Sequence, residues 1–139
     1  MSTFNTFEEI LAWQKARQIT QKIYLVSNSG DFARDFGLRD QMRRASISVM
    51  ANIAEGHGRR TETEFANFLN IARASAAEVQ SHLYVALDLG YIGQTEFDDI
   101  YLLLNEVSKM CLSLAQYLRK KQDGTQRLSQ HSQLGKLLR

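Results

Sequence analysis

The sequence predicts an all-α protein, an antiparallel up-down four-helix bundle that assembles into a homo-oligomer. The first observation is that apolar residues recur every three or four positions, without the period-two alternation that is typical of a strand. The second is that the 139 residues include eight glycines and no proline, so glycines have to mark the helix ends. The third is that the links are short, which makes successive helices antiparallel neighbours. The expected helices span residues 7–29, 36–55, 62–89 and 96–121.

Capping signals set these boundaries. Thr6 with Glu9, and Thr61 with Glu64, have the spacing of a capping box, in which a hydroxyl and a carboxylate satisfy free N–H groups at a helix start. Glycines follow the apolar runs, where a helix that ends in a left-handed residue favours glycine. These glycines are Gly30, the pair Gly56 and Gly58, Gly90, and Gly124.

One apolar stripe on each segment is expected to form the core. The fourth segment has the clearest stripe, a heptad seam sustained for three repeats: Phe97, Ile100, Leu104, Val107, Cys111, Leu114 and Leu118. The third repeats the pattern from Phe65 to Leu83, and the first repeats it from Ile10 to Val26. Cys111 and Trp13 lie on these stripes, and we therefore assign both to the core.

The second segment is apolar on two faces. Five of its residues fall within one sector that should face the core: Leu38, Met42, Ala45, Val49 and Ile53. Ile47, Met50 and Ala54 lie on the opposite side. Either the helix sits deep in the bundle, or its second face packs against another copy of the chain. We predict the second arrangement, with Ile47, Met50 and Ala54 at the oligomer interface.

Charge is distributed unevenly along the chain. Seventeen Lys and Arg against 15 Asp and Glu give a net charge of +2. Residues 119–139 hold six basic residues and one acid, whereas the rest of the chain is mildly acidic. We therefore predict a four-helix bundle over residues 1–121 and a basic, flexible tail over residues 122–139. Such a tail can bind phosphates with release of counterions, although basic tails also serve solubility alone.

Five arginines within 22 residues form the main candidate binding site, because guanidinium groups bind phosphates bidentately. They are Arg39, Arg43, Arg44, Arg59 and Arg60. Acidic residues are interspersed among them, from Asp35 to Glu64. Ion pairing within or between subunits is therefore the alternative interpretation.

Catalytic patterns are missing from the sequence. The three histidines lie in separate segments, and there is no Cys-x-x-Cys or His-Glu-x-x-His motif. We expect no catalytic residue, no metal, no cofactor and no enzymatic activity. The single cysteine favours a reducing compartment. Because no apolar run spans a membrane and no export signal is evident at the N-terminus, we expect a cytoplasmic protein without membrane contact.

Several motifs together resemble a known family. They are LRDQMRRASIS at 38–48, ANIAEG at 51–56 followed by Gly58 and Arg59, AWQKA at 12–16, FLNIARAS at 68–75, and LDLGYI at 87–92. This pattern covers about residues 10–118 and resembles the four-helix bundle proteins encoded within intervening sequences of bacterial 23S ribosomal RNA genes.

The resemblance implies a homo-oligomer, most simply a pentameric ring, because related members form such rings. It also implies kinship of fold with the accessory proteins of diversity-generating retroelements, which are basic pentamers that bind nucleic acid and a reverse transcriptase. The expected partners are therefore further copies of the chain, RNA or DNA, and a protein such as a reverse transcriptase. The predicted function is non-enzymatic binding of nucleic acid by the arginines and the tail. The alternative is an oligomeric protein-interaction scaffold with no direct nucleic-acid contact.

Overall fold

The protein is described by a computed structural model, which defines the backbone of residues 4–137 and the side chains of residues 4–124. Every regular element in this range is a helix, as the sequence predicts. Four of the helices are long: α1 (Leu11–Val26), α3 (Phe36–His57), α4 (Glu62–Asp88) and α5 (Gln94–Leu137). Two are short: η1 (Phe7–Glu9) and α2 (Gly30–Arg34). No helix in the described range is both long and apolar enough to cross a membrane.

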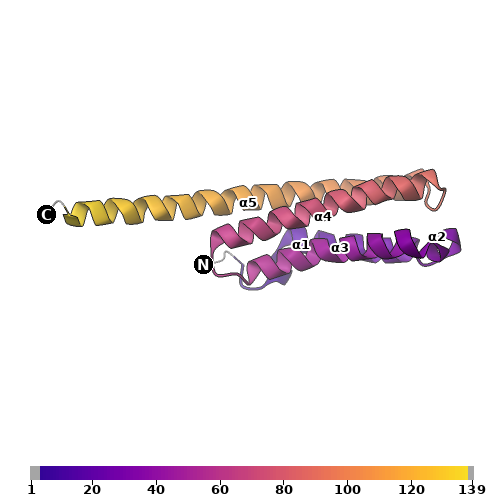
Figure 1. The fold of residues 1–139 in the computed structure, drawn as a ribbon, viewed down its shortest axis with the longest axis horizontal. Helices are drawn as coiled ribbons and strands as arrows, with labels where there is room; N and C mark the ends of the chain where they lie inside the picture. The colour runs from indigo at the N-terminus through magenta and orange to yellow at the C-terminus, as the bar shows by residue number, and fades with distance from the viewer. Residues whose placement is uncertain (1–3, 138–139) are drawn as a thin grey trace.

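The four long helices surround one apolar core. α1 packs against α3 and α5, and α4 also packs against α3 and α5. The α3–α4 link lies at one end of the molecule, near the N-terminus, whereas α2 and the α4–α5 link lie at the other end (Figure 1). We call these the α3–α4 end and the α2 end.

The predicted core seams are buried. On α5, six of the seven predicted positions are at most 6% exposed, and only Leu114 is half-buried at the edge of the core. Cys111 is completely buried, as predicted. Trp13 is half-buried, and its ring packs edge-on against Phe7 with 5.0 Å between centroids. Because a helix turns 100° per residue, the apolar period alone selects the residues that face the core.

The first helix starts later than predicted. Ile10 has an extended backbone and is buried, and it separates η1 from α1, which begins at Leu11. Thr6 makes no side-chain cap, and the Glu9 carboxylate instead accepts from the backbone N–H of Asn5 at 3.0 Å. Burial of Ile10 decides this start, rather than the capping box. The Thr61 hydroxyl does cap α4 as predicted, because it accepts from the N–H of Glu64 at 3.1 Å.

Two of the predicted helix-ending glycines lie inside helices. Gly56 is buried within α3, and Gly124 lies within α5, which continues to Leu137 instead of ending at residue 121. A glycine costs a helix only about 1 kcal/mol relative to alanine, so it need not end one. Gly90 does adopt the left-handed conformation after α4, with φ of 73°. Flexibility of the tail stays a prediction, and its side chains beyond residue 124 lie outside the described residues.

Candidate functional site

The five predicted arginines do not form one cluster. Arg39 and Arg43 lie on the first turns of α3, at the α2 end, whereas Arg59 and Arg60 follow the last turn of the same helix. The helix between Arg43 and His57 is about 20 Å long at a rise of about 1.5 Å per residue. Arg43 and Arg59 are therefore separated by most of the length of α3.

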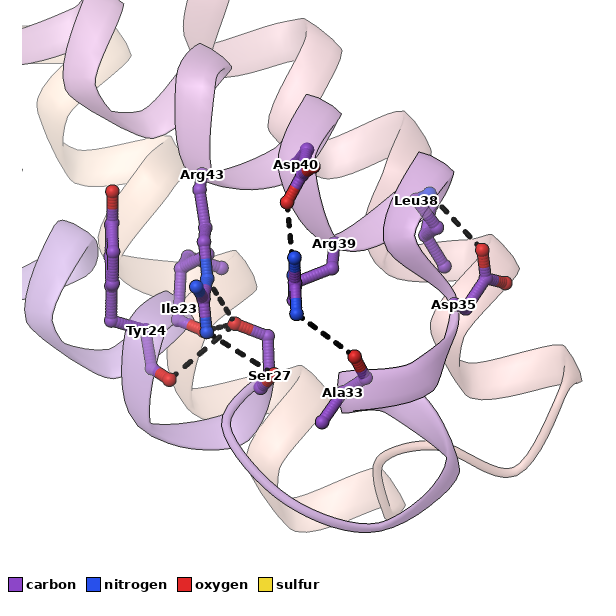
Figure 2. Close-up of polar contacts among 9 residues, drawn as sticks. All are labelled: Ile23, Tyr24, Ser27, Ala33, Asp35, Leu38, Arg39, Asp40 and Arg43. Atoms are coloured by element: carbon purple, nitrogen blue, oxygen red, sulfur yellow. Dashed lines mark hydrogen bonds and ion pairs between the residues drawn. The ribbon is translucent and has the colours of Figure 1, made fainter.

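Arg43 is engaged within the chain (Figure 2). Its Nε donates to the Ser27 hydroxyl at 2.9 Å, and its Nη2 donates to the Ser27 carbonyl at 3.2 Å. The Ser27 hydroxyl in turn donates to the Ile23 carbonyl at 2.6 Å. The guanidinium carbon lies 4.5 Å from the centroid of the Tyr24 ring. A cation placed at the end of α1 satisfies its free carbonyls and favours its dipole, so these contacts favour a structural role.

Arg39 is engaged in the same way at the next turn (Figure 2). Its Nη1 donates to the Ala33 carbonyl at 3.0 Å, and its Nε contacts the Asp40 carboxylate at 2.9 Å. These contacts tie the end of α2 to α3. Arg39 and Arg43 are therefore less available for phosphate contact, since two donors of each already bind groups of the same chain.

Asp35 connects α3 to the α4–α5 link at the α2 end. It caps α3 by accepting from the N–H of Leu38 at 3.2 Å, and it accepts from the Tyr91 hydroxyl of the α4–α5 link at 2.9 Å. The hydrogen bond to Asp35 raises the pKa of Tyr91 above its ordinary value. The Tyr91 ring also stacks on Phe32 of α2, with 5.3 Å between centroids. The α2 end is therefore tied together by polar and aromatic contacts between distant segments.

Arg44, Arg59 and Arg60 are more available for contact with a ligand than Arg39 and Arg43 are. Arg59 contacts the Glu55 carboxylate at 2.9 Å and lies over the Phe68 ring at 4.6 Å. Arg44 and Arg60 are exposed, and no hydrogen bond or ion pair engages either of them among the residues whose side chains are described. Of the five, Arg44 and Arg60 therefore have their donors free for a ligand.

α5 brings further cations to the α3–α4 end. Lys121 forms an ion pair with Glu62 at 3.5 Å, and Arg119 donates to the Asn67 side chain at 2.8 Å. Glu62 is only two residues after Arg60, so these contacts place residues 119–121 beside the α3–α4 link. We call the resulting group the basic end, and it consists of Arg59, Arg60, Arg119, Lys120 and Lys121.

In the sequence, residues 119–121 belong with the charge of the tail, and no pattern connects them with Arg60. The signal that connects them is the pairing of the third and fourth helices, which brings the end of one beside the start of the other. A cavity of about 340 Å³ opens at the same end, and Arg59, Arg60, Thr61 and His57 are among its lining residues. His57 holds the N-terminal segment there, because its Nε2 lies 3.0 Å from the Phe4 carbonyl oxygen.

The predicted interface residues differ in exposure. Ile47 is 42% exposed, whereas Met50 and Ala54 are half-buried. The Thr20 hydroxyl of α1 lies 3.4 Å from the Met50 sulfur, so Met50 faces α1 of the same chain. α1 therefore covers part of the second apolar face, and Ile47 remains open to solvent beside it.

Metal ligands and the cysteine thiol are the remaining candidates for reactive chemistry among the described side chains. No group of three or more His, Cys, Asp or Glu in that part of the chain is arranged to hold a metal ion. Burial raises the pKa of the Cys111 thiol to about 12, although the charge of Arg73 partly offsets this effect. A thiol that is buried and protonated at neutral pH is a poor nucleophile.

Comparisons with known proteins identify the family. The family model described as "23S rRNA-intervening sequence protein" matches residues 8–113. A crystal structure of a protein of unknown function from the S23 ribosomal protein family of Bacteroides thetaiotaomicron shares the fold, with a TM-score of 0.69. It is 24% identical, and the match covers 76% of this chain and 98% of that one. No significant match is found among curated proteins. The chain belongs to the family of 23S rRNA-intervening sequence proteins.

Proposed function

We propose that the protein is a non-enzymatic, homo-oligomeric up-down four-helix bundle that binds RNA or another nucleic acid through its basic end. The observation that carries this proposal is that Arg60 and Lys120 are both exposed at the α3–α4 end, without hydrogen-bond or ion-pair partners among the described side chains. Unpaired cations at one end of a molecule attract the phosphate backbone independently of sequence, with release of counterions.

An oligomer would strengthen such binding. One basic end offers few phosphate contacts, but several ends on one particle bind the same nucleic acid with higher avidity. The exposed apolar side chains of Ile47 on α3 and Tyr24 on α1 form what we call the α1–α3 face. This face supports assembly because Ile47 and Tyr24 expose 42% and 40% of their surfaces. A ring of five copies, which the family resemblance implies, would carry five basic ends.

Removal of the free cations tests the nucleic-acid proposal. We expect Arg60→Ala combined with Lys120→Ala to weaken binding to structured RNA and DNA in filter-binding titrations. Because two phosphate contacts are lost, the slope of log affinity against log salt should become shallower by about one to two units. The matched control is Lys22→Ala combined with Arg34→Ala, which removes the same charge at the α2 end. Equal effects of the two pairs, or no salt-sensitive binding by the unmodified protein, would contradict the proposal.

The second candidate is an oligomeric protein-interaction scaffold with no nucleic-acid contact, for a protein partner such as a reverse transcriptase. The observation that favours it is that Arg39, Arg43 and Arg59 already contact groups of their own chain. Loss of the oligomer, rather than of nucleic-acid binding, in the Arg60→Ala and Lys120→Ala variant would favour this candidate.

Assembly through the α1–α3 face is tested at Ile47. We expect Ile47→Asp to dissociate the oligomer while circular dichroism stays strongly helical, because an unpaired carboxylate is costly to bury between subunits. Sedimentation equilibrium at micromolar concentration measures the mass. Leu102→Asp is the matched control. Leu102 is 61% exposed, and it lies on α5, which is not one of the two helices that form this face. A monomeric unmodified protein would refute the oligomer, and unfolding of Ile47→Asp would refute the assignment of faces.

A further inference from the structure

α4 and α5 pack side by side, and a line of polar and aromatic side chains follows their contact (Figure 1). Near the start of α4, Arg119 donates to the Asn67 side chain at 2.8 Å. Further along, the Gln80 amide donates to the Asn105 side chain at 2.8 Å, and near the end of α4 the rings of Tyr84 and Tyr101 meet. We call this line the α4–α5 face, and it consists of Asn67, Arg73, Gln80, Tyr84, Tyr101, Asn105 and Arg119.

Arg73 is a half-buried cation in the middle of this face. Its Nη1 donates to the Asn70 side chain at 3.3 Å, and its Nε is buried without a hydrogen-bond partner in the described part of the chain. Its Nη2 also makes no hydrogen bond there, but it is not buried. The charge of Arg73 acts on the Cys111 thiol, so the guanidinium lies near α5. Because burial of an uncompensated charge is unfavourable, an anion at this guanidinium would be stabilising.

The carboxylates of the two helices lie elsewhere. Within residues 65–87 of α4 the only acid is Glu78, and within residues 100–122 of α5 the only acid is Glu106. Glu106 forms an ion pair with a lysine of α1 at 2.9 Å. Glu78 follows Arg73 by five positions, which places it about 140° around the helix. The α4–α5 face therefore carries cations without carboxylates over most of its length.

Arg119 is the second cation of this face. Its hydrogen-bond partner, the Asn67 amide, is neutral, so the charge of Arg119 is not compensated there. Arg119 also belongs to the basic end, and the α4–α5 face therefore continues from the basic end along α4. At a rise of about 1.5 Å per residue, Arg73 lies about 9 Å beyond Asn67, and Tyr84 lies about 17 Å beyond Arg73.

Tyr84 presents an aromatic ring at the far end of the face. It is 49% exposed, and the rings of Phe97 and Tyr101 contact it edge-on, with centroid distances of 4.9 and 5.8 Å. Packing therefore holds the orientation of the ring. An exposed ring held in this way is a surface on which an unpaired base can stack. Asp88 and Asp98 lie beyond it and would repel a phosphate backbone, so the binding surface ends there.

We propose that a single-stranded nucleic acid lies along the α4–α5 face, with phosphates at Arg119 and Arg73 and an unpaired base stacked on Tyr84. This inference rests on the proposed function and deepens it, because it names the form of the nucleic acid and extends the site beyond the basic end. A single strand fits better than a duplex because only unpaired bases can stack on a side chain. From Asn67 to Tyr84 the face is about 26 Å long, which corresponds to about eight nucleotides at about 3.4 Å each.

Arg73→Met tests whether the guanidinium serves the ligand or the fold. Without nucleic acid, we expect the variant to unfold at the same or a higher urea concentration, because it removes a half-buried charge that has no counterion. With single-stranded RNA of about 12 nucleotides, the slope of log affinity against log salt should become shallower by about one unit. Arg17→Met is the matched control, because Arg17 lies over the Trp13 ring of α1 at 5.9 Å. This control should leave the salt slope unchanged.

Two results with Arg73→Met would contradict the proposal. A loss of stability with an unchanged salt slope would show that Arg73 serves the fold alone. An unchanged slope in a variant that gains stability would show that the anion at Arg73 is not a phosphate of the nucleic acid, and it would favour an acidic protein partner instead.

Tyr84→Ala tests the stacked base. We expect this variant to weaken binding of the single strand by about fivefold or more, the loss expected for one stacked base, and to leave binding of a duplex of the same length unchanged. Tyr84→Phe keeps the ring and should bind both normally. Tyr117→Ala is the matched control, since Tyr117 is 51% exposed but lies two positions before Arg119 and thus on the opposite side of α5. Fluorescence anisotropy with labelled RNA measures all four affinities.

Equal effects of Tyr84→Ala on the single strand and the duplex, or no effect on either, would overturn the proposal. The variant that combines Arg60→Ala with Lys120→Ala separates this failure from failure of the proposed function, because it should weaken binding of both forms. If it does so while the variants at Arg73 and Tyr84 bind normally, the basic end binds nucleic acid and the α4–α5 face does not. If the unmodified protein binds neither form, the proposed function fails as well.

Discussion

Gly56→Ala is expected to lower the free energy of unfolding by up to about 2 kcal/mol, although alanine is the better helix former. A Cβ at Gly56 would lie 2.7 Å from Cβ of Phe68 and 3.0 Å from Cδ1 of Phe65. These atoms belong to α4, so α3 or α4 would have to move. Overpacking of this kind costs about 1–3 kcal/mol, which outweighs the gain of about 1 kcal/mol in helix propensity. Urea denaturation followed by circular dichroism measures the change.

Gly37→Ala is the matched control for this prediction. Gly37 lies in the first turn of the same helix, and the nearest atom to its added Cβ is Asp35 Oδ1 at 3.9 Å. The change should therefore be neutral or stabilising by up to about 1 kcal/mol. If Gly56→Ala is as harmless as Gly37→Ala, α3 and α4 do not approach as closely as the structure shows.

Leu104→Ala is expected to cost about 2–4 kcal/mol of stability. Leu104 is completely buried in the middle of the core seam of α5. Removal of its side chain loses the transfer free energy of the deleted atoms. It also leaves a cavity that the surrounding side chains fill only in part. Val107→Ala, also at a fully buried position, should cost somewhat less because fewer atoms are removed. The midpoint of urea unfolding measures both changes.

Leu102→Ala provides the comparison on the same helix. Leu102 is 61% exposed, two residues before Leu104, and its truncation should change stability by less than about 0.5 kcal/mol. If the variants at 102 and 104 were equally stable, the assignment of the inner and outer faces of α5 would be wrong.

The core could be read from the sequence because it depends on a local period. Spacing alone predicts Val107 and Ile53 in the core, and both are at most 1% exposed. Helix ends were less predictable, since capping signals compete with burial. Burial of Ile10 delays the start of α1, and Gly124 does not stop α5. The sequence shows these signals but not which of them dominates.

The candidate site could be predicted only in part. The sequence predicts Arg60 as a basic residue near a link, but it does not show that Arg60 has no hydrogen-bond or ion-pair partner among the described side chains. The same reasoning predicts Arg43, yet Arg43 donates to Ser27, sixteen positions earlier. The distinction depends on which helix lies beside each guanidinium, and that is a property of packing.

The sequence by itself determined the helical class, the number of long helices, their core stripes and the family. These features follow from spacing along a helix of fixed geometry, where a period of 3.6 residues assigns each side chain to a face. Only the tertiary structure decided that α1 covers Met50, that Gly56 lies against α4, and that Lys121 reaches Glu62. Each of these contacts joins residues on different helices. The distance between such residues depends on how the helices pack, and the period along a single helix does not determine that packing.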